Sequence, residues 1–340
     1  MRTLAIADLF LPSQVLRDAL GALAPSAIHI IEWPTRDKSD LHHRVRRIER
    51  DGPEIEAPPD AIWPHVEHAE LIVTHMCPIA AAVIERAANL TMIGVCRAGT
   101  ETIATAAAEA RGIRVINVPG RNARAVAEFA VGLMISERRN IARAHHAIVN
   151  GRWRKDFPNT DQDTELSDKT IGLIGFGAIG QLVALHLQSF GVNLLVHDPF
   201  QPENIIQQHG GRHVTLDELL QQSDVISLHA RGDESQPPLI GARELSKMKP
   251  TSYLINTARA YLIDHDALVC ALQQHQIAGA ALDVFEHEPI PADSPFRQLD
   301  NVTLTPHLAG STREAYHRCP YLLVDMIKPL INHRPDITEP

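Results

Sequence analysis

Several features that mark membrane, metal and nucleic-acid proteins are scarce in this sequence. Aromatic residues make up 4% of the 340 residues, and only four cysteines occur, each standing alone: Cys77, Cys96, Cys270 and Cys319. Isolated cysteines predict neither a disulfide framework nor a thiolate metal site, so we expect no metal. No apolar run approaches the roughly 20 residues that a membrane helix needs.

The chain also lacks long segments that carry charge of only one sign. The net charge is −9, with acidic and basic residues interspersed, which argues against a nucleic-acid surface. The first residues, MRTLAIADLF, hold too short an apolar run for a signal peptide. We therefore expect a cytoplasmic protein that binds neither nucleic acid nor membrane.

Short apolar runs alternate with helical patterns, which is typical of βαβ units and a parallel sheet. The length suits two domains, so the predicted fold class is α/β with two doubly wound parallel-sheet domains. The predicted strands are residues 3–8, 29–33, 71–75, 91–97 and 114–119, then 170–175, 193–198, 212–215, 224–229, 252–257, 277–284 and 301–306.

Three further segments carry helical patterns. In the charged segment 36–56, Leu41, Val45 and Ile48 recur at helical spacing and predict a short, exposed amphipathic helix. It could be a solvated surface helix, a flap over the substrate or a subunit contact. One long helix is predicted over residues 122–150, and another over residues 312–332.

A glycine-rich turn follows the strand predicted at residues 170–174. Gly175, Gly177 and Gly180 have the spacing of a dinucleotide-binding turn, and a helical pattern follows. Gly175 permits the tight turn, Gly177 lets the backbone approach a pyrophosphate, and Gly180 allows close helix packing. Free N–H groups at the helix start, at Ala178 and Ile179, would then face the phosphates.

An acidic residue follows at the expected distance. Asp198 ends the next predicted strand, eighteen residues after Gly180. Its carboxylate can accept hydrogen bonds from the ribose hydroxyls and would repel a 2′-phosphate. The sequence therefore predicts NAD, rather than NADP, as the cofactor.

Reactive residues follow three later predicted strands: Arg259, Glu288 and His307. The carboxyl ends of strands are where an open α/β sheet binds its ligands. A guanidinium can hold a substrate carboxylate in bidentate fashion, and an imidazole can exchange a proton near neutral pH. A carboxylate on the second ring nitrogen would orient the imidazole. These residue types predict oxidation of a 2-hydroxy acid.

Taken together, these stretches resemble the D-isomer-specific 2-hydroxyacid dehydrogenase family, which includes phosphoglycerate dehydrogenase and glyoxylate/hydroxypyruvate reductase. The resemblance is dense from about residue 90 to 315. It is carried by RAGT (97–100), NVPGRNARAVAE (117–128), GLIGFGAIG (172–180), SDVISLHA (223–230), MKPTSYLINTARA (248–260), AALDVFEHEP (280–289) and LTPHLAGST (304–312).

The resemblance implies a role for individual residues. Arg259, Glu288 and His307 match the catalytic triad. The matched cofactor-binding positions are Asp283 at the carboxamide, Thr257 and Ala258 along the nicotinamide ribose, and His229 in the cofactor cleft. Ala98 and Gly99 match the loop whose N–H groups bind the substrate carboxylate. His75, at the end of an early strand, is a further candidate for contacting substrate.

The family also implies a domain plan. A flavodoxin-like substrate domain would comprise residues 1–121 and 309–340, and a Rossmann NAD domain, residues 122–308, would be inserted into it. The active site would lie in the cleft between them. Family members are usually dimers through the long helix, so a homodimer is implied.

Some positions depart from the family pattern. Glu101, Thr102 and Ile103 replace a Gly-Val-Asp-Asn-like stretch, and Arg231 stands where many members have proline. Segment 36–56 is longer and more charged than the family suggests. No cluster of Lys and Arg near RAGT indicates a phosphorylated substrate, so the sequence does not identify the 2-hydroxy acid.

Three alternatives to this activity remain. An NAD(H)-sensing corepressor could use the same scaffold. A formate dehydrogenase is disfavoured because Glu288 stands where those enzymes have glutamine. A metal hydrolase is disfavoured because the pairs His65/His68 and His145/His146 lack a third ligand at suitable spacing.

Overall fold

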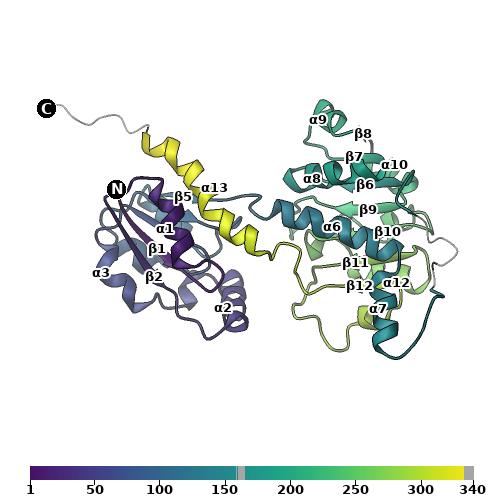
Figure 1. Ribbon diagram of the computed structural model, residues 1–340, viewed down its shortest axis with the longest axis horizontal. Helices are drawn as coiled ribbons and strands as arrows, with labels where there is room; N and C mark the ends of the chain where they lie inside the picture. Colours follow the sequence, from purple (N-terminus) through teal and green to yellow (C-terminus); the bar gives the residue numbers. More distant parts are fainter. Residues whose placement is uncertain (158, 160–164, 333–340) are drawn as a thin grey trace. The chain divides into compact units, whose positions relative to one another are not determined.

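The computed structural model describes residues 1–157, 159 and 165–332, and the chain divides into two compact units (Figure 1). The first unit comprises Met1–Asn122 and the described part of Thr312–Pro340, and the second comprises Ala123–Ser311. Each unit is built on one parallel sheet. The predicted fold class, two doubly wound parallel-sheet domains, is confirmed.

The first unit has a five-stranded sheet in the order β2-β1-β3-β4-β5, and every pairing is parallel. Apolar side chains cover both faces, as expected for a parallel sheet between helices. The strands are β1 (Arg2–Ala7), β2 (Ala27–Glu32), β3 (Leu71–Thr74), β4 (Met92–Val95) and β5 (Arg114–Asn117). The helices are α1 (Ser13–Gly21), α2 (Lys38–Asp51), α3 (Trp63–Val66), α4 (Ala81–Arg86), α5 (Thr105–Ala110) and α13 (Arg313–Asn332), with 3₁₀ turns at Pro53–Ile55 and Asp60–Ile62.

The C-terminal helix α13 packs on this first sheet although it is far away in the sequence. It lies beside α1 (Figure 1), and its Leu323 and Ile327 are buried in the same core as Leu16 and Leu20 of α1. The chain therefore leaves the first unit after β5 and returns to it through α13.

The charged segment forms the predicted amphipathic helix, α2. Asp37 caps it, its side chain accepting a hydrogen bond from the Asp40 backbone N–H at 2.9 Å. Leu41, Val45 and Ile48 are buried while most of the intervening charged residues face solvent. The apolar stripe thus attaches the helix to the core, as its spacing predicts.

The second unit has a seven-stranded parallel sheet in the order β12-β11-β10-β9-β6-β7-β8. The strands are β6 (Thr170–Ile174), β7 (Asn193–His197), β8 (Gly211–His213), β9 (Val225–Leu228), β10 (Tyr253–Asn256), β11 (Gly279–Leu282) and β12 (Val302–Leu304). The helices are α6 (Ala123–Arg138), α7 (Ile141–Val149), α8 (Ala178–Leu187), α9 (Glu203–Gln208), α10 (Leu216–Gln222), α11 (Ala242–Leu245) and α12 (His265–Gln273), with 3₁₀ turns at Gln188–Phe190, Ala260–Leu262 and Pro295–Gln298.

This strand order creates a switch point. The chain continues from β6 to β7 and β8 on one side, and from β9 through β12 on the other. In open α/β sheets, ligands bind outside the carboxyl ends of the strands at such a point. The crevice is expected where β6 and β9 end.

The prediction of one uninterrupted helix over residues 122–150 is wrong. The structure has two helices, α6 and α7, separated at Arg139 and Asn140. Asn140 adopts a left-handed conformation, with φ of 54°, which a continuing α-helix cannot contain. Its side-chain oxygen accepts a hydrogen bond from Arg143 at 3.2 Å, and Arg143 also bonds the buried carboxylate of Glu137 at 2.6 Å. These polar contacts stabilise the break.

Candidate active site

The glycine-rich turn joins β6 to α8 and lies at the switch point. Gly175 has φ of +94°, and a Cβ there would lie 2.6 Å from Cα of Ala230, which follows β9. A Cβ on Gly180 would overlap the carbonyl oxygen of Gly175, whereas one on Gly177 would meet no atom within 4 Å. Gly175 and Gly180 are therefore required by close packing. At Gly177 the backbone is open to approach, as a bound pyrophosphate requires.

Asp198 follows β7 beside this turn and is 8% exposed. One carboxylate oxygen accepts a hydrogen bond from the backbone N–H of Phe176 at 2.6 Å. The other accepts hydrogen bonds from Phe200 at 2.8 Å and Gln201 at 3.1 Å. The carboxylate is thus held in place by the backbone at the end of β7, where a ribose acceptor is expected.

Two buried polar side chains at the strand ends have no hydrogen-bond partner among the described residues. They are His229 after β9, through both ring nitrogens, and Thr257 after β10, through its hydroxyl. Burial lowers the pKa of His229 to about 4, so the ring is neutral at physiological pH. Unpaired buried polar groups are rare in native proteins. Those at His229 and Thr257 fit a bound polar ligand such as NAD.

Asp283, after β11, is fully buried and organises the loop that carries His307. It accepts hydrogen bonds from the Thr305 hydroxyl at 2.6 Å and from the backbone N–H groups of Leu308 and Ala309, each at 2.9 Å. His307 itself has φ of 55°. The hydrogen bonds on both sides of His307 hold it in this sparsely populated conformation.

His307 and Glu288 form a pair at the end of the sheet. Nδ1 of His307 lies 3.1 and 3.0 Å from the two carboxylate oxygens of Glu288. The hydrogen bond to Glu288, together with its charge, raises the pKa of His307 above its usual value, although burial opposes the shift. The imidazole side chain is 49% exposed. Because Nδ1 faces the carboxylate, Nε2 is the nitrogen left to exchange a proton with a substrate.

Arg259 lies just after β10, and its positive charge partly opposes the rise in the pKa of His307 that Glu288 causes. It is exposed and makes no ion pair with a carboxylate among the described residues; its Nη1 donates only to the neighbouring carbonyl of Ala258, at 2.8 Å. The buried Asn256 holds this loop. Its amide donates to the carbonyl of Arg259 at 2.8 Å and accepts from the N–H of Ala258 at 3.0 Å. Arg259 can therefore bind an anion.

The remaining predicted residues, His75, Ala98 and Gly99, belong to the first unit. His75 directly follows β3 and is completely buried, with Nδ1 2.9 Å from a carboxylate oxygen of Asp8. Ala98 and Gly99 lie in the loop after β4, where the Glu101 carboxylate packs against Gly99. These three residues thus lie at the carboxyl edge of the first sheet.

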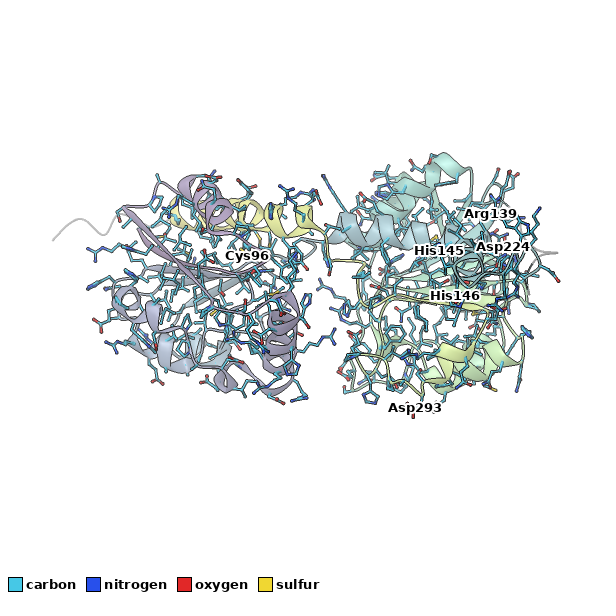
Figure 2. The ribbon with its side chains drawn as sticks, turned by 60° about the horizontal axis from the view of Figure 1, so that its bottom comes forward. Cys96, Arg139, His145, His146, Asp224 and Asp293 are labelled. Carbon is cyan, nitrogen blue, oxygen red and sulfur yellow. The ribbon has the colours of Figure 1, made fainter. Side chains whose placement is uncertain are left out.

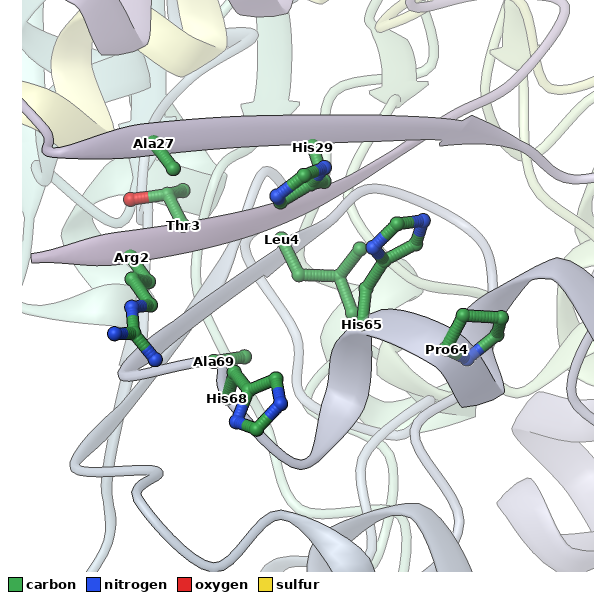
Figure 3. Close-up of a pocket in the computed structure, with 9 residues that line it drawn as sticks. All are labelled: Arg2, Thr3, Leu4, Ala27, His29, Pro64, His65, His68 and Ala69. Carbon is green, nitrogen blue, oxygen red and sulfur yellow. The ribbon is translucent and has the colours of Figure 1, made fainter.

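A separate cavity of about 190 Å³ lies at the opposite edge of the first sheet (Figure 3). Its lining includes His29, His65 and His68, and the rings of His29 and His65 stack with centroids 4.3 Å apart. It opens at the amino ends of β1 and β2, away from the strand ends where open α/β sheets bind ligands.

No group of three His, Cys, Asp or Glu residues suited to a metal occurs in the described part of the chain. His145 and His146 lie on α7 (Figure 2), and they belong to no such group among the residues that the structure describes. Across the same described residues, no helix is long and apolar enough to span a membrane.

Comparison with known proteins identifies the family of this chain. Residues 131–309 match the family model described as D-isomer specific 2-hydroxyacid dehydrogenase, NAD binding domain. A glyoxylate reductase of Thermofilum pendens is 43% identical over 244 residues, covering 71% of each chain. The chain belongs to the D-isomer specific 2-hydroxyacid dehydrogenase family. The predicted family, and NAD as the cofactor, are confirmed.

Two further relatives define the extent of this likeness. A D-3-phosphoglycerate dehydrogenase of Archaeoglobus fulgidus is 39% identical over 73% of this chain, but the match spans only 47% of that protein. This chain therefore covers about half the length of that relative. The solved NAD-dependent formate dehydrogenase of Staphylococcus aureus, in complex with NAD, is 29% identical, with a TM-score of 0.70 over 98% of this chain and 96% of that one.

Proposed function

We propose that this 2-hydroxyacid dehydrogenase interconverts a D-2-hydroxy acid and its 2-keto acid, with His307 as the acid/base. The observation that carries the proposal is the His307–Glu288 pair, at 3.0 Å, on the sheet edge that also bears Arg259. A histidine with a raised pKa, a carboxylate that orients it and an unpaired guanidinium supply what this reaction needs from the protein.

Each group has one role in this proposal. Arg259 binds the substrate carboxylate through its guanidinium. When the hydroxy acid is oxidised, Nε2 of His307 takes the hydroxyl proton while the C2 hydrogen leaves as hydride. Bound NAD supplies the hydride acceptor. In the reverse direction, protonated His307 donates to the carbonyl oxygen of the keto acid, and Glu288 stabilises the imidazolium.

The cofactor contacts of single residues belong to the same proposal. Backbone N–H groups of Gly177, Ala178, Ile179 and Gly180 would bind the pyrophosphate, because the first N–H groups of a helix have no partner within it. Asp198 would accept from the adenosine ribose. The unpaired polar atoms of His229 and Thr257 support a role at the nicotinamide end, together with Ala258 and Asp283.

The proposal extends to the substrate domain and to the oligomeric state. Ala98 and Gly99 of the RAGT loop would donate backbone N–H groups to the substrate carboxylate, and residues 1–121 and 309–340 would form the substrate domain. Ile141, Ile148 and Trp153, in and just after α7, are large exposed apolar side chains, which supports a homodimer through this region.

The test is a screen of 2-keto acids with NADH, followed at the nicotinamide absorbance band. We expect at least one 2-keto acid to be reduced to its D-2-hydroxy acid. That result would exclude an NAD(H)-sensing corepressor as the main function. NADH binding without turnover of any 2-keto acid would contradict the proposal.

A further inference from the structure

The cavity at the amino edge of the first sheet, of about 190 Å³, is lined by four basic side chains (Figure 3). They are Arg2 of β1, His29 of β2, and His65 and His68 in and just after α3. Among the described residues that line the cavity, none is acidic. Its composition is that of an anion site, and the proposed function makes no use of it.

The parallel register of β1 and β2 places two of these side chains on one face of the sheet. Leu4 of β1 lies opposite His29 of β2. Since alternate residues of a strand point to the same face, Arg2 shares this face with Leu4 and so with His29. His65 approaches the same face from α3 (Figure 3), and its ring stacks on that of His29 with centroids 4.3 Å apart and an angle of 17° between the planes.

The acidic residues next to the cavity are engaged elsewhere. Glu70 accepts a hydrogen bond from the backbone N–H of Arg2 at 2.7 Å, and Glu67 pairs with Arg86 at 2.9 Å. In the part of the chain that the structure describes, none of the four basic side chains pairs with a carboxylate. Their N–H groups are therefore available to a ligand.

Protonation of the stacked rings is disfavoured while the cavity holds no anion. Burial, and then the charge of His29, lower the pKa of His65 below its usual value. The unfolded chain therefore binds this proton more readily, and stability is lost as pH falls through the usual histidine pKa of about 6.5. An anion beside the rings would oppose this loss, because it favours the protonated form.

The arrangement suits an anion better than a metal ion. The nitrogen lone pairs of an imidazole lie in the ring plane, so two rings stacked face to face do not direct them at one ion between the rings. No group of three metal-ligating residues includes them in the described chain, and the guanidinium of Arg2 would repel a cation. A guanidinium and protonated imidazoles are donors that suit the oxygen atoms of an anion.

We propose that this cavity is a second ligand site, which binds a small oxyanion, that is, a carboxylate or a phosphate. Arg2 and the protonated rings of His65 and His68 donate to its oxygen atoms. The buried side chains of Leu4 and Ala69 line the cavity as well and limit competition from water. The inference goes beyond the proposed function and does not depend on it, because the site lies at the edge of the first sheet opposite the RAGT loop.

The test measures anion binding to the full chain through its melting temperature, with chloride at the same ionic strength as the reference. Sulfate represents a tetrahedral phosphate, and malonate represents a carboxylate. At least one of them should raise the melting temperature of the wild type. Sulfate does not titrate between pH 6 and 8, so its affinity reports on the protein; we expect it to be at least about threefold higher at pH 6. Equal affinity at both pH values would overturn the role of the histidines.

Matched variants locate the binding. Arg2→Met should weaken sulfate binding about fivefold, as expected for a charge-assisted hydrogen bond from an exposed group, and His65→Gln should remove most of the pH dependence. Arg114→Met, at the amino end of β5, and His43→Gln, on α2, replace exposed residues outside the cavity and should bind as the wild type does. Unchanged affinity in Arg2→Met, or an equal loss in Arg114→Met, would overturn the proposal.

A local signal separates this cavity from Arg259 of the candidate active site, which can also bind an anion. The Hε1 NMR signal that is missing in His65→Gln belongs to His65. It should shift during sulfate titration of both the wild type and Arg259→Met. A His65 signal that does not move, or stabilisation by Zn²⁺ but by neither anion, would overturn the proposal. Loss of keto-acid reduction in Arg259→Met would bear only on the proposed function.

Discussion

Replacing Glu288 by glutamine tests how the catalytic histidine is tuned. The glutamine side chain can still accept a hydrogen bond from Nδ1 of His307, so the ring orientation is kept while the negative charge is lost. The raised pKa of His307 depends first on the Glu288 hydrogen bond and then on its charge. In Glu288→Gln the pKa of His307 is therefore expected to fall.

The sign of the pH effect follows from the role of the proton. Reduction of the keto acid needs protonated His307, so its rate is high below the pKa of His307 and declines as pH rises through that pKa. Oxidation needs the neutral ring and behaves in the opposite way. In Glu288→Gln the decline of the reduction rate should move to lower pH, and the rise of the oxidation rate should move in the same direction.

The magnitude can be worked from the geometry. A hydrogen bond to a charged group contributes about 1.5–3 kcal/mol, and 1.4 kcal/mol corresponds to a factor of ten in rate. Since the imidazole is 49% exposed, solvent screening favours the lower end of this range. We expect kcat for reduction at pH 8 to fall about 10-fold.

The assay is steady-state keto-acid reduction by NADH between pH 5 and 9, with the stability of each protein checked at every pH. His287→Gln, at the neighbouring position outside the pair, is the control and should leave the profile unchanged. An identical pH profile in the wild type and Glu288→Gln would refute the claim that Glu288 tunes His307.

Two further predictions concern the cofactor turn. Gly175→Ala should lower the free energy of unfolding by at least about 1–3 kcal/mol, because Gly175 has a positive φ and the new Cβ would clash with the backbone of Ala230. Gly177→Ala should fold normally but weaken NADH binding at least 10-fold. Equal stability of the two variants in urea denaturation would contradict this reading. Asp198→Asn should reduce the preference for NADH over NADPH by 10-fold or more in kcat/KM. Equal use of both cofactors by the wild type would refute the role of Asp198.

The strands and the cofactor turn could be predicted from the sequence because their signals are local. Apolar runs such as residues 170–174 mark buried parallel strands, and the glycine spacing after them reflects a packing need that the structure shows at Gly175 and Gly180. The amphipathic helix α2 was equally predictable, since three apolar residues at helical spacing determine its buried face.

The sequence does not predict the break between α6 and α7, because helix propensity indicates only weakly where a helix ends. Asn140 was one polar residue in a continuous helical pattern, and its left-handed conformation depends on contacts with Arg143 and on the Glu137–Arg143 pair, which form only in the folded chain. A hint existed: asparagine is among the few residues that adopt this conformation readily.

The residues that support the site could not be predicted from the sequence either. Asn256 holds the Arg259 loop and Thr305 bonds Asp283, but an asparagine ending a strand and a threonine before a proline have many other uses.

The proposed activity depends most directly on His307 as the acid/base. In His307→Asn, turnover of the best 2-keto acid should fall by 10²- to 10⁴-fold, the usual contribution of a positioned acid/base, while NADH binding measured by fluorescence titration changes less than threefold. Turnover within tenfold of the wild type, with NADH binding intact, would contradict the account.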